Sequence, residues 1–313
     1  MSELNQVFNI TGPVFAIIAI GYLAIKYSIL SRDASKSLAG FTVNFALPAL
    51  LFKAISERPL SQLFNSDYLL VYAGGSLLSF TALFLIYRKL RQEKLAASAI
   101  FAMGGSFSNS LMIGYPVILQ LFGNAALAPL ALTLMVENFI MMPLALTLAE
   151  TGRNTGSDRV KLLLTVLLRV IRNPIIMAII CGVIFSFSGL QLPVIILKVV
   201  DSFALTVSGV ALFAIGGMLV GIKIRLMLTD ISLIMASKLI VHPLMILLMI
   251  SLVPQISKFN AAVALILASM PMFGIFPVIG QKYGVGQACA AVLVPTTIAS
   301  FISLNIVIWL VGI

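Results

Sequence analysis

The stretch YPVILQLFG at residues 115–123 is repeated as FPVIGQKYG at residues 276–284, at an offset of 161 positions. Five of the nine residues are identical in the two copies. At the first and eighth positions, Tyr in one copy corresponds to Phe in the other. The same offset relates Pro13 to Pro174. Self-similarity at one fixed spacing along the chain predicts two halves that are built alike.

The composition is that of a membrane protein, because 61% of the 313 residues are hydrophobic and only 10% are charged. A soluble domain has about 25% charged residues, whereas a helix that crosses a bilayer needs about 20 apolar ones. The apolar runs are too long for the strands of a membrane β-barrel and lack their alternation. We therefore predict an all-α integral membrane protein with ten transmembrane helices, near residues 8–27, 37–55, 67–88, 95–122, 126–149, 170–188, 195–222, 230–253, 259–281 and 287–311.

The net charge of +10 is distributed unevenly between the loops. When the loops are assigned alternately to the two sides, fifteen of the 20 Lys and Arg residues fall on one side and four on the other. The positive-inside rule makes the basic side cytoplasmic, so both termini are predicted to lie outside. The basic excess is therefore a topology signal, and we expect no nucleic-acid partner.

Each half contains an odd number of helices, so the two halves are predicted to cross the membrane in opposite senses. Residues 1–150 form the first five-helix repeat, residues 151–169 a polar cytoplasmic linker, and residues 170–313 the second, inverted repeat. Inverted repeats of this kind are typical of secondary transporters that work by alternating access.

The repeated stretches lie in segments that are rich in helix-breaking residues. Proline removes a backbone hydrogen bond, and unpaired backbone groups are tolerated at membrane depth only inside protein or a wet cavity. We predict that segments 95–122 and 259–281 are broken and cross, and that the free amide ends favour an anion. Simple kinks at packing helices are the alternative. The residues predicted to form the crossing are Gly104, Gly105, Pro116, Pro271, Gly274 and Pro277, and its candidate substrate ligands are Ser108, Asn109, Ser110 and Ser269.

A weaker pair of interruptions lies in segments 37–55 and 195–222. Asn44 precedes a proline, and Ser208 precedes a glycine. Both side chains are predicted to line the substrate site, although packing of small residues between helices would explain them equally well.

Four polar residues at membrane depth are candidates for ion or proton coupling: Glu137, Asn138, Lys238 and His242. A charged side chain at the bilayer centre costs about 2.5 to 3.5 kcal/mol unless it has a partner or a wet cavity. Glu137 or His242 would relay a proton, and Lys238 would balance a bound carboxylate or replace a coupling cation. Sodium coupling would use several oxygen ligands instead, and a uniporter would need neither ion. A buried structural pair is the alternative.

The sequence contains no phosphate-binding loop, no Cys/His spacing typical of a metal site and no Ser/His/Asp motif. We therefore expect no enzymatic activity, no cofactor and no structural metal, and only Na⁺ or H⁺ as a coupling ion.

Four features resemble the auxin efflux carrier family: NFALP at residues 44–48, RNPII at 172–176, VSGVALFAIGG at 207–217, and the paired prolines. The likeness is to bacterial members, which include malonate and other organic-acid permeases, and it covers nearly the whole chain. It implies a ten-helix inverted-repeat fold with a scaffold part and a transport part, a homodimer, and organic anions as substrates. It also implies that Asn109 contacts the substrate, while the Asn expected at the second crossing is replaced by the sequence around Ser269.

These observations predict a secondary active transporter of small organic anions, carboxylates such as malonate or auxin-like weak acids, in the inner (cytoplasmic) membrane of a bacterium. Its expected partners are the substrate, the lipid bilayer and a second copy of the chain. The alternatives are a sodium- or proton-coupled symporter of the bile-acid-carrier type, a channel, and a membrane ligand sensor that does not transport.

Overall fold

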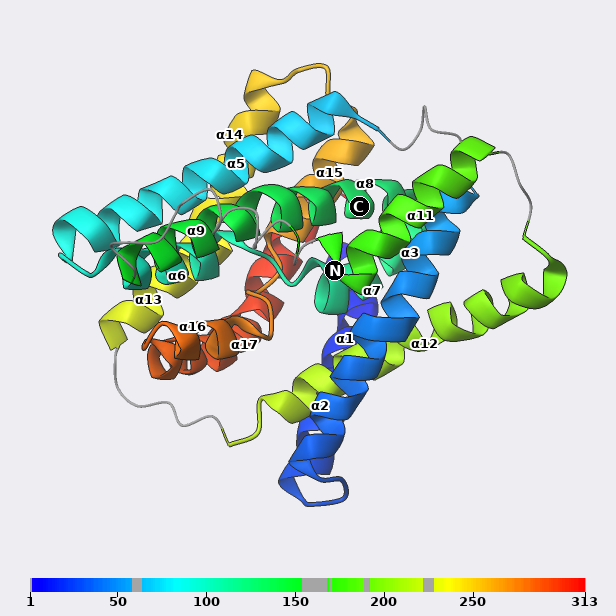
Figure 1. Ribbon diagram of the computed structural model, residues 1–313, viewed down its shortest axis with the longest axis horizontal. Coiled ribbons are helices and arrows are strands. Elements are labelled where there is room, and N and C mark those ends of the chain that lie inside the picture. The colour runs from blue at the N-terminus through cyan, green and yellow to red at the C-terminus, as the bar shows by residue number, and fades with distance from the viewer. Residues whose placement is uncertain are drawn as a thin grey trace. The chain divides into compact units, whose positions relative to one another are not determined.

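The computed structural model describes residues 2–57, 64–153, 168, 171–188, 192–221 and 228–312 (Figure 1). All regular elements in these ranges are helices, and six are long and apolar enough to cross a bilayer. Four further apolar helices, Thr11–Lys26, Leu95–Ser106, Pro174–Ser188 and Lys258–Ala268, are shorter. The prediction of an all-α membrane protein is confirmed, whereas ten crossings in two inverted repeats remain a prediction.

The chain folds into two compact units, and each takes residues from both halves of the sequence. The first unit comprises Met1–Asn65, Leu111–Leu132 and Ile171–Gly221, and the second comprises Ser66–Ser110, Thr133–Val170 and Ile222–Ile313. Most of the predicted linker at residues 151–169 lies outside the described residues.

The first unit is built around the packing of α1 (Ser2–Lys26) on α12 (Val194–Met218). Glycines make the close approach possible: a Cβ on Gly216 would collide with the backbone oxygen of Ile18, and a Cβ on Gly21 with that of Phe213. Segment 195–222, in which a weaker interruption was predicted, is a continuous helix over Val194–Met218, and Gly216 within it serves close packing. The other elements of this unit are α2 (Arg32–Phe41), η1 (Thr42–Ala46), α3 (Leu47–Ser56), α7 (Tyr115–Phe122), η4 (Gly123–Ala126) and α11 (Pro174–Ser188).

The glycine contact gives a stability prediction for Gly216→Ala. Alanine normally stabilises a helix relative to glycine by about 1 kcal/mol, but a Cβ here meets backbone that cannot move aside, so we expect a loss of about 1–3 kcal/mol. The matched control is Gly209→Ala in the same helix, where a Cβ would have nothing within 4 Å. Thermal unfolding of both purified variants checks this, and equal midpoints for the two would contradict it.

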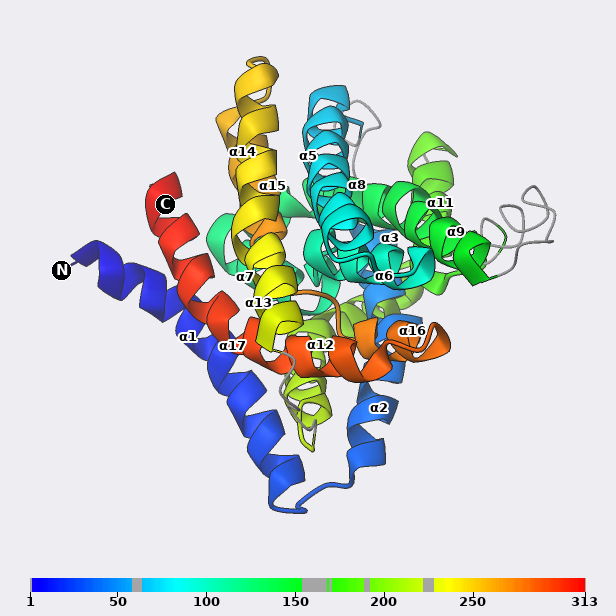
Figure 2. The same ribbon diagram turned by 90° about the vertical axis from the view of Figure 1, so that its left-hand side faces the viewer.

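In the second unit, α5 (Ser66–Leu85) lies beside α14 (His242–Leu252) and α6 (Leu95–Ser106) (Figures 1 and 2). Figure 2 shows that α17 (Gly286–Val311) bends along its length, and Pro295 inside the helix accounts for the bend. The unit also contains η2 (Ile86–Leu90), η5 (Val136–Met141), α9 (Met142–Arg153), α13 (Leu228–Ala236), η6 (Ser237–Val241), α15 (Lys258–Ala268) and α16 (Phe276–Lys282). The short helix α8 (Leu127–Met135) begins in the first unit and ends in the second.

Candidate functional site

The predicted helix at 95–122 is interrupted after Ser106. Helix α6 ends there, Phe107 is extended (φ −108°, ψ 127°), and helical structure resumes with the π-helical turn η3 (Ser110–Gly114). The local sequence explains the end of α6, because two glycines precede Ser106 and the Ser106 hydroxyl donates a hydrogen bond to the carbonyl of Ala102 (2.8 Å).

The predicted helix at 259–281 is interrupted in the same way. Helix α15 ends at Ala268, the Ser269 hydroxyl donates to the carbonyl of Leu265 (2.8 Å), and helical structure resumes at Phe276 in α16. Pro271 has no backbone N–H to continue α15, whereas Pro277 lies in the first turn of α16, where proline is well tolerated.

The two interruptions pair with each other inside the second unit. The backbone N–H of Asn109 donates a hydrogen bond to the carbonyl of Pro271 (2.8 Å), and Ser108 and Met272 form an isolated antiparallel bridge. The rings of Phe107 and Phe273 pack with centroids 4.5 Å apart. The backbone pairing supplies hydrogen-bond partners for groups that have no helical partner at the breaks. Non-helical backbone at membrane depth requires such partners.

Lys238 lies directly against this paired segment and is completely buried. Its ammonium group has three partners: the Ser108 hydroxyl (2.9 Å), the Ala268 carbonyl (2.6 Å) and Nδ1 of His242 (2.8 Å). When Lys238 is charged, its three N–H groups have three acceptors, and the His242 tautomer that accepts at Nδ1 donates from Nε2 to the Ser76 hydroxyl, 3.0 Å away. A buried ammonium with all its donors satisfied is compatible with the interior of the protein.

Glu137 is hydrogen-bonded to the other end of the paired segment, at Ser110. Its carboxylate is 3% exposed and accepts hydrogen bonds from the Ser110 hydroxyl (2.6 Å) and from the Tyr72 hydroxyl (3.1 Å). The Tyr72 hydroxyl also lies 3.5 Å from that of Ser108. One buried cation and one buried anion are thus joined through a polar network along Ser108–Ser110, and their opposite charges reduce the cost of burying either.

The structure brings together six of the predicted functional residues: Ser108, Asn109, Ser110, Glu137, Lys238 and His242. Ser269 lies at the second interruption, where it caps α15. Gly104 and Gly105 pack tightly, since a Cβ would meet the Phe276 ring at the first and the Ser237 and Leu83 side chains at the second.

The other predicted residues lie apart from this network. Asn138 donates to the carbonyl of Leu134 (2.9 Å) in its own helix, and Asn44, which is exposed, donates to that of Gly40 (2.8 Å) in the first unit. Ser208 lines a cavity in the first unit, and Pro116 lies in the first turn of α7 there. Gly274 has open space around it.

Sequence reasoning missed the contribution of α5. Tyr68, Tyr72, Ser76 and Ser79 are all buried and lie three or four residues apart, on one face of this helix. Tyr68 is hydrogen-bonded to Thr133 (2.7 Å), and the Ser79 hydroxyl donates to the carbonyl of Gly105 (3.2 Å). These four residues form a polar stripe on an otherwise apolar helix, and this pattern is the sequence signal that could have identified the face.

Comparison with known proteins agrees with a transport role. A family model described as membrane transport protein matches residues 7–308. A provisionally named malonate transporter of Rhizobium meliloti (strain 1021) is 29% identical over 298 residues, which are 95% of this chain and 93% of that protein. The uncharacterized transporter YfdV of Escherichia coli (strain K12) is 24% identical over 244 residues, 75% of this chain and 76% of that protein.

A third relative has a different role in its name. The lysosomal cholesterol signaling protein of Mus musculus is 27% identical over 293 residues, 88% of this chain, which spans 33% of that protein's length.

Proposed function

This chain belongs to the membrane transport protein family, the auxin efflux carrier family that its motifs resemble, and from that premise we propose that it moves small organic carboxylates across a bacterial cytoplasmic membrane. It is a multi-pass membrane transporter. We propose that it works by alternating access as a homodimer, with both termini outside and the substrate bound at the paired interruptions. The observation that carries the proposal is the joining of the two breaks by Asn109 and Pro271 beside a buried ammonium group.

The hydrogen-bond directions favour a negatively charged ligand at this place. Ser108 accepts a hydrogen bond from Lys238, so its own hydroxyl hydrogen is oriented away from the ammonium and is available for a substrate oxygen. The Lys238 ammonium group therefore acts on the substrate through the Ser108 hydroxyl, which is hydrogen-bonded to the ammonium and donates to the substrate. The amide group of Asn109, on the next residue, supplies a second donor. Hydrogen bonds to a charged group are about twice as strong as neutral ones.

Substrate movement requires the site to face each side of the membrane in turn. We propose that the second unit, which contains every residue of the site, moves as the transport part while the first serves as the scaffold. Elevator-like and rocking motions both satisfy this description. The hydrogen bond between the two interruptions would move with the second unit, so it need not break during transport.

The partners of Lys238 also bear on the coupling ion. Oxygen atoms from unwound backbone and hydroxyl groups are what a sodium ion requires, and here the Ala268 carbonyl and the Ser108 hydroxyl are bonded to the ammonium instead. We propose that Lys238 is a tethered cation that takes the place of sodium, and that a proton gradient or the membrane potential drives transport.

Counterflow of labelled malonate in proteoliposomes tests both the function and the driving ion. We expect saturable exchange that unlabelled small carboxylates compete with and that an imposed sodium gradient does not accelerate. A proton gradient or a potential is expected to change the initial rate. Exchange that requires sodium would contradict the tethered-cation proposal and favour a sodium-coupled symporter, while exchange of no carboxylate would contradict the substrate class.

A ligand sensor is the second candidate, and the similarity to the lysosomal cholesterol signaling protein favours it. A sensor would show saturable binding of its ligand with no flux of that ligand into proteoliposomes. Measuring binding and flux on the same preparation separates the two roles.

A further inference from the structure

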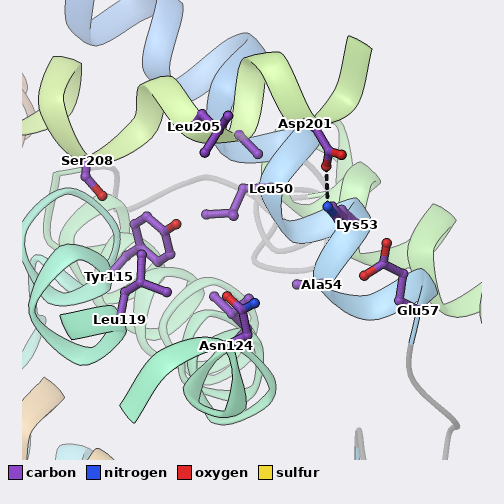
Figure 3. A pocket seen from close by; sticks show the side chains of 12 residues that line it. Leu50, Lys53, Ala54, Glu57, Tyr115, Leu119, Asn124, Asp201, Leu205 and Ser208 are labelled. Atoms are coloured by element: carbon purple, nitrogen blue, oxygen red, sulfur yellow. Dashed lines mark hydrogen bonds and ion pairs between the residues drawn. The ribbon is translucent and has the colours of Figure 1, made fainter. Parts of the chain in front are cut away.

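The first unit contains a cavity of about 520 Å³, and none of its lining residues belongs to the paired interruptions (Figure 3). It is lined by residues of α3, α7, η4, α8 and α12, all within the first unit. Cavities of roughly 300 to 1,000 Å³ are the usual size of small-molecule sites. The transport mechanism proposed above uses no charged residue of this cavity.

The charged side chains gather at one end. Lys53 of α3 and Asp201 of α12 form an ion pair across the cavity wall, and Glu57 lies beside them, while Tyr115 and Ser208 lie at the other end (Figure 3). The side chains of Lys53 and Asp201 are 31% and 37% exposed, so solvent reaches the pair. A solvent-accessible ion pair of this kind adds little to stability, so both partners can exchange to a ligand.

Apart from Asn124, the lining between the two ends is apolar. Leu50, Leu119 and Leu205 face the space (Figure 3), together with Ala54 and Leu127. Glu57 is exposed and adds a second carboxylate beside Lys53. The charges that face the cavity are therefore one ammonium and two carboxylates, and of these Asp201 is paired with the ammonium.

We propose that this cavity binds a zwitterion with an apolar body, with its carboxylate or phosphate on Lys53 and its ammonium on Asp201. Such a ligand gives Lys53 and Asp201 each an opposite partner and leaves the net charge unchanged. A simple carboxylate on Lys53 would leave Asp201 without a cation. A simple amine on Asp201 would place two ammonium groups side by side in a half-buried wall. The chemistry fits an apolar amino acid or the headgroup of an aminophospholipid.

Three probes of one shape test this on the purified protein in phosphatidylglycerol nanodiscs: phenylalanine, 3-phenylpropionate and phenethylamine. We expect phenylalanine to raise the thermal midpoint saturably, and the two singly charged probes to bind at least about tenfold more weakly. Equal effects of all three probes, or no effect of phenylalanine, would overturn the proposal. Because no transport is measured, the outcome is independent of the proposed carboxylate transport.

Nanodiscs made with phosphatidylethanolamine identify the source of the zwitterion. If this lipid abolishes phenylalanine binding, the headgroup occupies the cavity, and if it does not, the free amino acid is the ligand. Either result supports zwitterion recognition by the Lys53–Asp201 pair.

Two variants locate the site. The neutral pair Lys53→Gln/Asp201→Asn is expected to lose phenylalanine binding, whereas its control, Asp33→Asn/Lys36→Gln at an exposed ion pair on α2, keeps it. Leu119→Trp fills the apolar part without touching the ion pair and is also expected to block binding. Unchanged binding in either cavity variant would overturn the assignment of the site.

Discussion

Replacing Asn109 by alanine is expected to reduce malonate exchange to less than about a tenth of the wild-type rate, because each hydrogen bond to a charged group contributes about 1.5–3 kcal/mol. The variant keeps the backbone N–H that bonds to Pro271, so the pairing of the two interruptions survives. Only the side-chain amide beside the proposed carboxylate position is removed. Initial rates in proteoliposomes, normalised to the amount of reconstituted protein, measure the effect.

The matched control for this variant is Asn138→Ala. Asn138 is also an asparagine at membrane depth, but its amide bonds to the carbonyl of Leu134 in its own helix and not to the network. We expect this variant to exchange malonate at nearly the wild-type rate. Equal rates for the two variants would show that Asn109 is not a substrate ligand.

Replacing Lys238 by methionine is expected to abolish transport and to destabilise the protein by about 3–5 kcal/mol, since removing one member of a buried charged pair leaves the other without compensation. Methionine retains much of the side-chain volume but leaves Ser108, His242 and the Ala268 carbonyl without the ammonium. Thermal unfolding and malonate exchange of the purified variant measure the two effects separately.

A double variant distinguishes loss of stability from loss of function. Lys238→Met/Glu137→Gln removes both buried charges, so we expect part of the lost stability to return while transport stays absent. Substantial transport by this double variant would contradict the role of Lys238 in substrate binding, and a fully stable Lys238→Met single variant would contradict the charge network.

The sequence indicated the positions of the helix interruptions because proline and glycine act locally. Pro271 and the glycines before Ser106 end helices through their own backbone chemistry, whatever surrounds them. The four-residue spacing of Lys238 and His242 likewise placed both on one helix face, and their hydrogen bond follows from it.

The pairings between distant segments could not be derived in the same way. The bond from Asn109 to Pro271 and the ion pair of Lys53 with Asp201 join residues more than 140 positions apart, so they depend on the tertiary fold. The two compact units are also assembled from separated stretches of both halves. Tyr72 and Ser76 escaped notice because isolated hydroxyl groups are common in membrane helices, where they usually bond to their own backbone.

The most direct test is a structure of the protein with a bound brominated dicarboxylate, in which anomalous scattering from bromine locates the ligand. The account predicts a single site within hydrogen-bonding distance of the Ser108 hydroxyl and the Asn109 amide, in the second unit. A bromine peak only in the first-unit cavity beside Lys53, or only at the protein surface, would contradict the assignment of the paired interruptions as the carboxylate site.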